Sequence, residues 1–185
     1  KRMNIATERL LLREVIEDDW TSILAYQRKP EYLRYYEWKS RSEKDVRDFV
    51  DMFLEQQGER PRLRWQLAVE LKASGRLVGT CGIRTDTADA VEGDIGFELD
   101  PDFWGKGYAS EAAAAILRYG FEDMALHRIW AWCVEDNLGS IHVLEKLGMK
   151  QEARLREKQF YKGRWWNHLV YAMLDREWKA MTTGE

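Results

Sequence analysis

The spacing of apolar residues in the first third of the chain predicts one strand followed by two helices. Residues 7–13 are interpreted as a first strand, and a short helix is expected from Asp18 or Asp19 through Tyr26. A second helix is expected to begin at Ser42 and to end at Gly58. Its apolar residues recur on one helical face: Val46, Phe49, Val50, Phe53 and Leu54.

The remaining two thirds predict a strand-rich pattern. Residues 65–71 and 76–83 form a hairpin around Gly75, and a third strand runs from about Asp94 to Leu99. A turn with two glycines then opens a helix that extends to about Met124. Residues 127–134 are apolar at nearly every position, which predicts a central strand buried on both faces. A short helix between Asn137 and Gly148 and two final strands around residues 161–164 complete the pattern.

This mixed order of strands and helices indicates the α/β class, with a central mixed sheet flanked by helices. A chain of 185 residues without a linker or repeat is expected to form one domain over residues 1–185, with a core from about 7 to 178.

Charge and composition narrow the possible partners. The net charge of -3 and the lack of a face-wide excess of Lys and Arg argue against nucleic acid as the main partner. The basic run at residues 60–64 is interpreted as a solvated loop. No apolar run is long enough to cross a membrane, and no signal-peptide pattern is found, so no membrane partner is expected.

The two cysteines, Cys81 and Cys133, lie in apolar strand-like runs, which predicts free buried thiols and a reducing, cytoplasmic location. The three histidines are scattered without the spacing of metal ligands, so no metal site is predicted.

The most informative segment lies at residues 100–112, where an apolar strand gives way to an alanine-rich helix. Gly105 and Gly107 allow a tight turn in which successive backbone N–H groups face one side. Those donors and the positive end of the helix dipole form an anion site suited to a diphosphate. Ser110 or a neighbour is expected to cap the helix, and Glu111 suits its first turn.

Two further motifs stand at fixed distances from this turn. Asn137 and Ser140 follow about thirty residues later, and the sequence Glu145-Lys146-Leu147-Gly148-Met149 closes the second helix. Together with Ile95-Gly96-Phe97-Glu98-Leu99 and the opening strand at 7–13, these motifs resemble the GNAT superfamily of acetyl-CoA-dependent N-acetyltransferases, and most closely its RimJ/RimL branch. The resemblance covers nearly the whole chain and implies the GNAT fold, with acetyl-CoA as co-substrate.

The resemblance implies a set of cofactor-binding positions. The phosphate loop maps onto Trp104, Gly105, Lys106, Gly107, Tyr108 and Ala109, with Ser110 next to it. Trp104 stands where the family usually has Gln or Arg, which removes a side-chain donor and leaves the backbone amides. Phe97, Glu98 and Leu99 match the strand segment that splays from its neighbour and binds the pantetheine arm, with the Phe97 N–H polarising the thioester carbonyl. Asn137 matches the asparagine that holds this arm, and a helix cap is a compatible role.

The sequence departs from the family pattern in the acid that protonates the leaving thiolate. Many members have a tyrosine in the helix after Asn137, but Leu144 occupies that position. In the RimL-like branch a serine earlier in the helix is proposed as the acid, and Ser140 matches it; a structural serine is the alternative. Candidate bases are Glu98, Asp94 and Glu70, with a water chain to solvent as the competing route.

Aromatic residues in two segments are expected to flank the acceptor end of the cleft, although core packing and a contact in a possible homodimer are alternatives. They are Tyr35, Tyr36, Trp38, Phe160, Tyr161, Trp165 and Trp166. Family members often carry an acid in the last hairpin where this chain has Asn167.

The function predicted from these residues is acetyl transfer to a primary amine, with a protein N-terminal α-amine as the leading acceptor. Two alternatives stay open: a non-catalytic acyl-CoA-binding or regulatory module, and an enzyme that acetylates antibiotics or polyamines.

Overall fold

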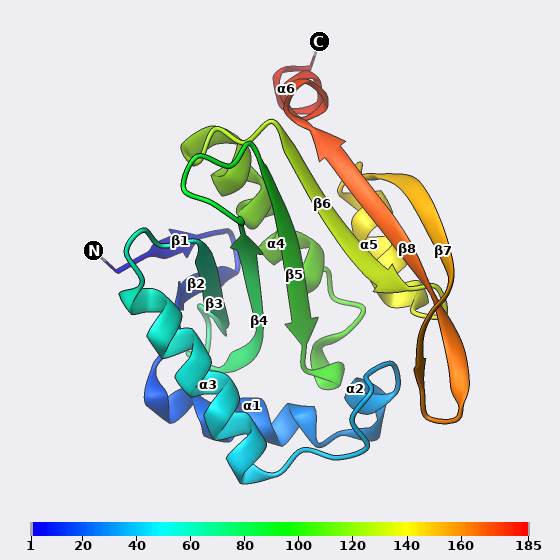
Figure 1. The fold of residues 1–185 in the computed structure, drawn as a ribbon. Coiled ribbons are helices and arrows are strands. Elements are labelled where there is room, and N and C mark those ends of the chain that lie inside the picture. The colour runs from blue at the N-terminus through cyan, green and yellow to red at the C-terminus, as the bar shows by residue number, and fades with distance from the viewer. Residues whose placement is uncertain (1, 185) are drawn as a thin grey trace.

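The computed structural model describes residues 2–184, which contain one eight-stranded mixed sheet (Figure 1). The strand order is β1-β2-β3-β4-β5-β6-β8-β7. The strands are β1 (Asn4–Ala6), β2 (Leu10–Glu14), β3 (Arg64–Leu71), β4 (Leu77–Arg84), β5 (Glu92–Leu99), β6 (Arg128–Val134), β7 (Lys150–Tyr161) and β8 (Arg164–Leu174). Neighbouring strands are antiparallel except β5 and β6, which are parallel. The predicted fold class is confirmed.

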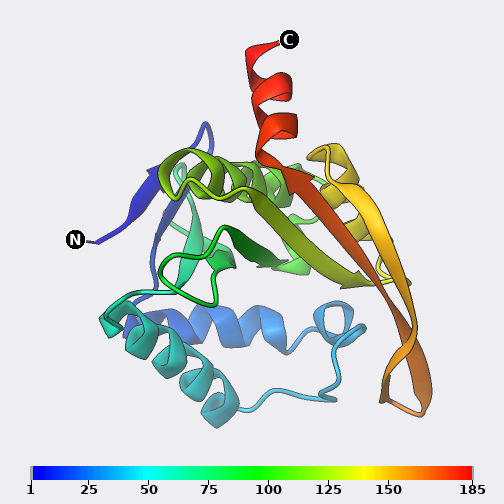
Figure 2. The same cartoon turned by 45° about the horizontal axis from the view of Figure 1, so that its top comes forward.

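Helices cover both faces of this sheet (Figures 1 and 2). They are α1 (Trp20–Gln27), α2 (Pro30–Leu33), α3 (Glu43–Gly58), α4 (Tyr108–Arg118), α5 (Leu138–Lys146) and α6 (Asp175–Thr183). Helices α1 and α3 pack on the face that carries Ala68, and α4 and α5 pack on the opposite face against Leu67, Ile83 and Ile129. The apolar side chains between the helices and the sheet form the core.

Local signals account for the helix ends that were predicted correctly. The Ser42 hydroxyl accepts a hydrogen bond from the Asp45 N–H at 3.1 Å, and the Asp45 carboxylate accepts one from the Ser42 N–H at 2.8 Å. This reciprocal pair is a capping box, which fixes the start of α3. Gly148 has φ +88° after α5, a conformation that glycine adopts without steric strain.

The prediction that residues 127–134 are buried on both faces is wrong. Ile129, Ala131 and Cys133 are buried on the side of α4 and α5, whereas the side chain of Trp132 is 49% exposed on the opposite face. The reason is that α1 and α3 contact the half of the sheet containing β3 and β4. On this open face Trp132 stacks on His168, and Val134 packs with Tyr161 and Trp166 of the last hairpin instead of a helix.

Three short or polar elements were absent from the sequence prediction: β1, α2 and α6. Strand β1 has three residues and α2 has four, so neither is long enough to display a hydrophobic period. Cys81 and Cys133 are buried free thiols, and burial raises their pKa values to about 12 and about 11. Within residues 2–184, none of the helices has the length and apolar character required to span a bilayer.

His168 on β8 provides a test of the packing in this half of the sheet. Its ring stacks on Trp132 with centroids 4.3 Å apart, and its Nε2 atom is buried without a hydrogen-bond partner among the described residues. Burial, with a smaller contribution from Lys158, lowers the pKa of His168. The unfolded chain therefore binds the proton more readily, and stability is lost as the pH falls below the unfolded pKa of about 6.5.

We expect His168→Phe to stabilise the protein more at about pH 5 than at about pH 8, because the phenyl ring keeps the stack and removes the protonatable atom. A gain of about 1–2 kcal/mol at the lower pH is expected from urea unfolding. The control is His142→Phe at an exposed histidine, which should change stability equally at both pH values. An equal gain for His168→Phe at both pH values would contradict this account.

Candidate active site

Strands β5 and β6 diverge after a short paired stretch (Figure 1), and we call the gap in main-chain pairing between their two edges the opening. Their parallel pairing covers only Glu92–Asp94 against Arg128–Trp130. Beyond these residues β5 continues to Leu99 and β6 to Val134 without a partner on this side. The main-chain groups of these two unpaired segments are therefore available to a ligand.

The main-chain N–H and C=O groups of β5 point alternately toward β4 and toward the opening, and one hydrogen bond to β4 shows which residues point which way. The Asp100 N–H donates to the Val78 carbonyl at 2.7 Å, so Asp100 points its main-chain groups toward β4. Because this direction alternates along an antiparallel pair, Phe97 and Leu99 point theirs away from β4 and into the opening. The Leu99 carbonyl accepts a hydrogen bond from the Trp104 indole at 3.0 Å. The N–H and C=O of Phe97 have no partner within residues 2–184.

The same reasoning applies to β6. The Glu135 N–H donates to the Asn167 carbonyl of β8 at 2.9 Å, so the main-chain groups of Glu135 point toward β8. Because the direction alternates, those of Trp132 and Val134 point away from β8 and toward the opening. The Val134 carbonyl accepts from the Asn137 N–H at 2.9 Å. Two rows of main-chain donors and acceptors thus face each other across the opening. Such a slot suits an extended chain that itself carries amide groups.

The glycine turn lies at the end of β5. Gly105 and Gly107 have φ values of +74° and +82°, and α4 starts immediately afterwards at Tyr108. In the part of the chain that the structure describes, no group accepts a hydrogen bond from the N–H of residues 105–110. These six donors surround the positive end of the α4 dipole, an arrangement that binds anions. The cap position is Gly107, so Ser110 lies within the first turn and does not cap the helix.

Two cationic side chains approach the turn from other elements. A Cβ atom built on Gly107 would lie 3.3 Å from Arg9 Nη2 and 3.9 Å from Lys146 Nζ. Arg9 comes from the segment before β2, and Lys146 comes from the last turn of α5. Their positive charges add to the field of the backbone donors.

A polar clamp fixes the turn to the start of β2. The Glu111 carboxylate accepts hydrogen bonds from the Thr7 hydroxyl at 2.5 Å and from the Arg9 N–H and Nε at 2.9 and 2.7 Å. Arg9 Nη1 donates to the Lys106 carbonyl at 2.9 Å. The turn is thereby bonded to Arg9 through its own main chain as well as through Glu111.

A buried carboxylate anchors the turn from its other end. Asp100 accepts hydrogen bonds from Lys29 Nζ at 2.7 Å and from the Asp102 N–H at 3.0 Å. Hydrogen bonds from the same lysine to Asp100 and Asp102 raise the pKa of Lys29. The end of α1 is in this way joined to the start of the glycine turn.

Of the three candidate bases, only Glu98 lies on the unpaired part of β5. Its carboxylate accepts hydrogen bonds from Tyr26 Oη at 2.6 Å, Gln27 Nε2 at 3.0 Å, Tyr32 Oη at 2.5 Å and Thr80 Oγ1 at 3.3 Å. The first two donors belong to α1 and the third belongs to α2. Burial and the negative charge of Glu98 raise the pKa values of Tyr26 and Tyr32, so both phenols stay protonated as donors.

The structure does not bring Asp94 and Glu70 to the opening. Asp94 lies in the paired part of β5, where Arg84 Nε donates to its carboxylate at 3.0 Å. Glu70 lies on β3, two strands from β5, and its carboxylate pairs with Arg13 Nε at 2.7 Å. Both carboxylates therefore neutralise arginines on the sheet surface.

Asn137 and Ser140 lie where β6 leads into α5. The Asn137 side-chain oxygen accepts a hydrogen bond from the Ser140 N–H at 3.2 Å, so Asn137 caps the helix. The Ser140 hydroxyl makes no hydrogen bond to another group within residues 2–184. Leu144 is 1% exposed and belongs to the core. The cap role expected for Asn137 is present, and a free hydroxyl stands near the end of the opening.

The two aromatic segments meet beside the opening on the face of α1 and α2. Tyr161 Oη donates to the Tyr35 carbonyl at 2.5 Å, and the rings of Tyr35 and Trp166 pack edge to face. Tyr32, Tyr36 and Trp38 form a stack with centroid spacings of 4.6 and 4.8 Å. Asn167 bonds to Glu135 at 2.7 Å and accepts from the Glu157 N–H at 2.8 Å, which is a structural role.

Several contacts at the site had no signal in the sequence. Arg9 and Glu111 are 102 positions apart, and nothing in their local context indicates that they pair. Of the two tyrosines that donate to Glu98, Tyr26 lies in a predicted helix without any predicted site residue, and Tyr32 lies in α2, which was not predicted. The register of Phe97 against β4 also depends on the assembled sheet.

Comparisons with known proteins agree with this geometry. The profile of the acetyltransferase (GNAT) domain matches residues 9–150. The uncharacterized N-acetyltransferase YnaD of Bacillus subtilis is 34% identical over 95% of this chain and 99% of its own length. The crystal structure of a GNAT-family acetyltransferase from Bacillus anthracis, also 34% identical, aligns with a TM-score of 0.83 over 95% of this chain and 100% of that chain.

A more distant structure shares the fold. RimL, a ribosomal L7/L12 alpha-N-protein acetyltransferase in complex with coenzyme A, is 19% identical and aligns with a TM-score of 0.79 over 93% of this chain and 98% of its own. The fold and the site define an acyltransferase architecture. The chain belongs to the GNAT family of N-acetyltransferases, as its sequence motifs predict.

The clamp at Glu111 gives a test of how the glycine turn is held. Burial acts to raise the pKa of Glu111, but the hydrogen bonds from Thr7 and Arg9 outweigh it and lower the pKa. We expect Glu111→Gln to destabilise the protein by about 1–3 kcal/mol near neutral pH. Because a carboxylate with a lowered folded pKa contributes its full stabilisation above the unfolded value of about 4.3 and loses it as the pH falls through the folded pKa, the difference should shrink as the pH falls toward 3. Chemical unfolding at several pH values measures it; a constant difference would refute the ionic clamp.

Proposed function

We propose that the protein transfers the acetyl group of acetyl-CoA to a primary amine, and that the preferred acceptor is the N-terminal α-amine of a polypeptide. The observation that carries this proposal is the row of unpartnered N–H groups at residues 105–110 beside the unpaired edges of β5 and β6. Membership of the GNAT family supports the same reaction.

The residues present fit coenzyme A. Its diphosphate carries negative charge that the free amides, the α4 dipole, Arg9 and Lys146 would stabilise. Its pantetheine arm contains two amide groups, which match the exposed main-chain donors and acceptors of Phe97 and Trp132. In the proposed pose the Phe97 N–H donates to the thioester carbonyl, where negative charge develops during attack.

The acceptor amine would approach from the side of α1 and α2, where Glu98 and the stacked tyrosines lie. A neutral amine attacks the thioester carbon, the C–N bond forms, and the thiolate leaves. An α-amino group has a reference pKa of about 8, so a useful fraction is neutral near pH 7–8. A lysine amine, with a pKa of about 10.4, has a much smaller neutral fraction.

Positioning supplies most of the acceleration in this proposal. Holding two reactants in line can contribute roughly 7–11 kcal/mol. Proton transfer by a placed acid or base typically contributes about 10²–10⁴-fold in rate. We assign the base role to Glu98, acting directly or through its bonded phenols, and the acid role toward the thiolate to Ser140. The leaving thiol has a reference pKa of about 8.5, so the acid is helpful rather than obligatory.

The fold is shared to the same degree by RimL, named as an acetyltransferase of ribosomal L7/L12, and by a spermidine N-acetyltransferase from Vibrio cholerae, so the choice of acceptor class rests on charge. A polyamine is the rival acceptor, and it would need acidic groups around the entrance. The charged side chains that line the cavity beside α2 are instead basic: Arg28, Arg34, Lys39, Arg41 and Lys162. This charge favours an acceptor that is not itself a polycation.

The glycine turn can be tested by substitution. We expect Gly107→Val to weaken coenzyme A binding at least about 100-fold, because a side chain there fills the space over the amides. The matched control is Gly75→Val in the β3–β4 turn, where φ is +71° and the backbone strain is similar. Isothermal titration with coenzyme A measures both variants. If Gly75→Val loses as much affinity as Gly107→Val, the effect is general unfolding and the phosphate assignment fails.

The proposed roles of Ser140 as acid and Glu98 as base can be tested by measuring the rate of acetyl transfer. Purified protein is incubated with acetyl-CoA and a panel of peptides and small amines while free thiol is measured. Ser140→Ala should lower kcat about 10-fold or less, with acetyl-CoA affinity unchanged. Glu98→Gln should lower kcat about 10²-fold or more, with acetyl-CoA affinity unchanged.

Two results would oppose these roles. An unchanged rate for Ser140→Ala would dismiss the serine as acid. Tight acetyl-CoA binding without turnover on any amine would support the alternative of a non-catalytic acyl-CoA-binding protein.

A further inference from the structure

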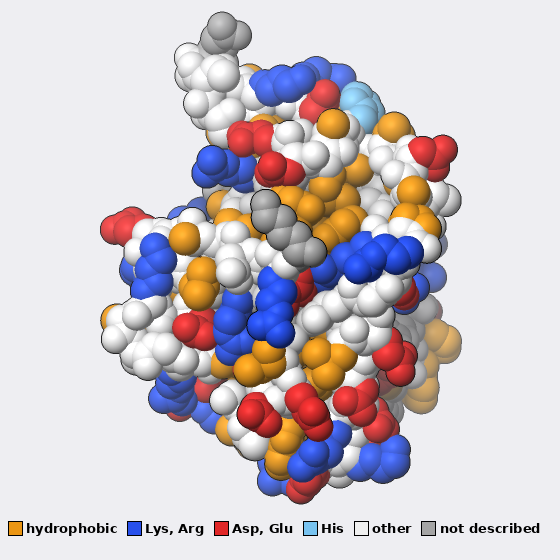
Figure 3. Space-filling model, turned by 90° about the vertical axis from the view of Figure 1, so that its left-hand side faces the viewer, with side chains coloured by type: hydrophobic (Ala, Val, Ile, Leu, Met, Phe, Trp, Pro, Cys, Tyr) orange, Lys and Arg blue, Asp and Glu red, His pale blue; other side chains and the backbone are white. Residues whose placement is uncertain are grey.

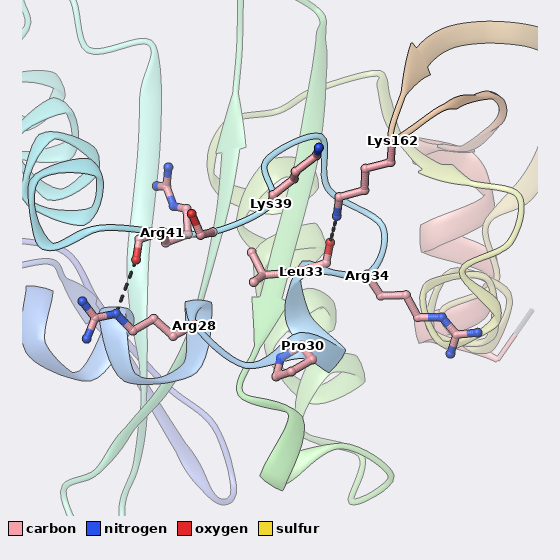
Figure 4. A pocket seen from close by; sticks show the side chains of 8 residues that line it. Arg28, Pro30, Leu33, Arg34, Lys39, Arg41 and Lys162 are labelled. Carbon is pink, nitrogen blue, oxygen red and sulfur yellow. Dashed lines mark hydrogen bonds between the residues drawn. The ribbon is translucent and has the colours of Figure 1, made fainter.

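A cavity with a wholly cationic charged lining lies beside the proposed acceptor entrance (Figure 4). It has a volume of about 600 Å³ and is formed by the end of α1, α2, the segment before α3 and the tip of the β7–β8 hairpin. Its charged residues are Arg28, Arg34, Lys39, Arg41 and Lys162, and the side chain of Arg34 extends away from the other four.

The larger hollow at the β1 edge of the sheet is different. It has a volume of about 1200 Å³ and combines arginines with Glu14, Glu111 and Asp123 (Figure 3). Charges of both signs meet on that side of the molecule, so they neutralise one another. The cavity beside α2 has no such balance.

No acidic side chain within residues 2–184 forms an ion pair with any of the five cations. Arg28 donates to the Arg41 carbonyl at 3.3 Å, and Lys162 donates to the Leu33 carbonyl at 2.7 Å. Burial and the nearby charge of Lys39 lower the pKa of Lys162. In a chain with a net charge of -3, this cluster is a local excess of positive charge that an anion would relieve.

The cavity is close to the proposed reaction centre. The Gln27 side-chain amide accepts from Arg41 Nε at 3.0 Å and donates to Glu98 Oε1 at 3.0 Å. Because both groups bond to one amide, they lie within about 8 Å of each other. An extended peptide advances about 3.3 Å per residue, so side chains at its second to fourth positions would reach the cavity when the N-terminal amine lies at Glu98.

We propose that this cavity binds acidic side chains of the acceptor, which makes the substrate a polypeptide with Asp or Glu at the second to fourth positions after its N-terminal amine. The inference rests on the proposed function and narrows it. Several carboxylates in succession can pair with several of the cations at once. The cations themselves are mostly exposed, so their attraction for such a segment should fall steeply with salt.

The test compares two fluorescent peptides of equal length with the same first residue. One carries Asp and Glu at the second to fourth positions, and the other carries Asn and Gln there. Binding to the protein saturated with coenzyme A is measured by anisotropy, so that no turnover is needed. We expect the acidic peptide to bind at least about tenfold more tightly at low salt, and this advantage to disappear at about 0.5 M salt.

The matched variants reverse the same number of charges at two places. Arg34→Glu with Lys39→Glu changes the cavity, and these side chains make no hydrogen bond or ion pair within residues 2–184. Arg176→Glu with Lys179→Glu makes the same change on α6, at the other end of the sheet (Figure 1). The first pair should abolish the preference for the acidic peptide, and the second should preserve it; affinity for coenzyme A should not change in the first.

The possible outcomes separate the two proposals. Equal binding of the two peptides, or loss of the preference in the α6 variant as well, would overturn the acidic-acceptor inference. Displacement of the acidic peptide by an equal concentration of inorganic phosphate would also overturn it, because the cavity would then be a general anion site. Preferential binding of the acidic peptide without acetylation would uphold the cavity and reject the proposed function.

Discussion

The end of hydrogen-bonded pairing between β5 and β6 is the constraint on which the rest of the site depends. An unpaired main-chain group costs free energy when it is removed from water, so a sheet that opens in its middle requires either solvent or a ligand there. The register places Phe97 and Trp132 on facing edges of this opening. Where the two strands diverge, β5 leads directly into the glycine turn before α4. The unpaired strand edges and the amides of the turn therefore both arise from the same end of pairing.

Charge holds the parts of this opening in place. Glu111 joins the glycine turn to Thr7 and Arg9, and Asp100 joins its start to Lys29 at the end of α1. Glu98 collects donors from α1, α2 and β4. In each case one carboxylate accepts several hydrogen bonds from elements far apart in sequence. Such charge-assisted contacts are stronger than neutral ones, and they fix the geometry that acyl transfer needs.

The sequence predicted those elements whose signals are local. The capping box at Ser42 and Asp45, the hairpin at Gly75 and the glycine after α5 all specify structure within a few residues. The exposure of Trp132 and the separation of β5 from β6 could not be predicted, because both depend on which half of the sheet the helices cover. The three candidate bases were equivalent in sequence; the register alone distinguishes Glu98, and its catalytic role stays a prediction.

The hydrogen bonds of the last hairpin have a mechanical consequence. Tyr161 and Lys162 hold the main chain on either side of Arg34, and Tyr32 in the same short segment holds the Glu98 carboxylate. The hairpin tip, α2 and this carboxylate thus form one continuous linkage. A ligand that displaces the hairpin tip would therefore strain the hydrogen bond between the Tyr32 phenol and Glu98. Steric misfit beside the hairpin would in this way disturb the proposed catalytic carboxylate.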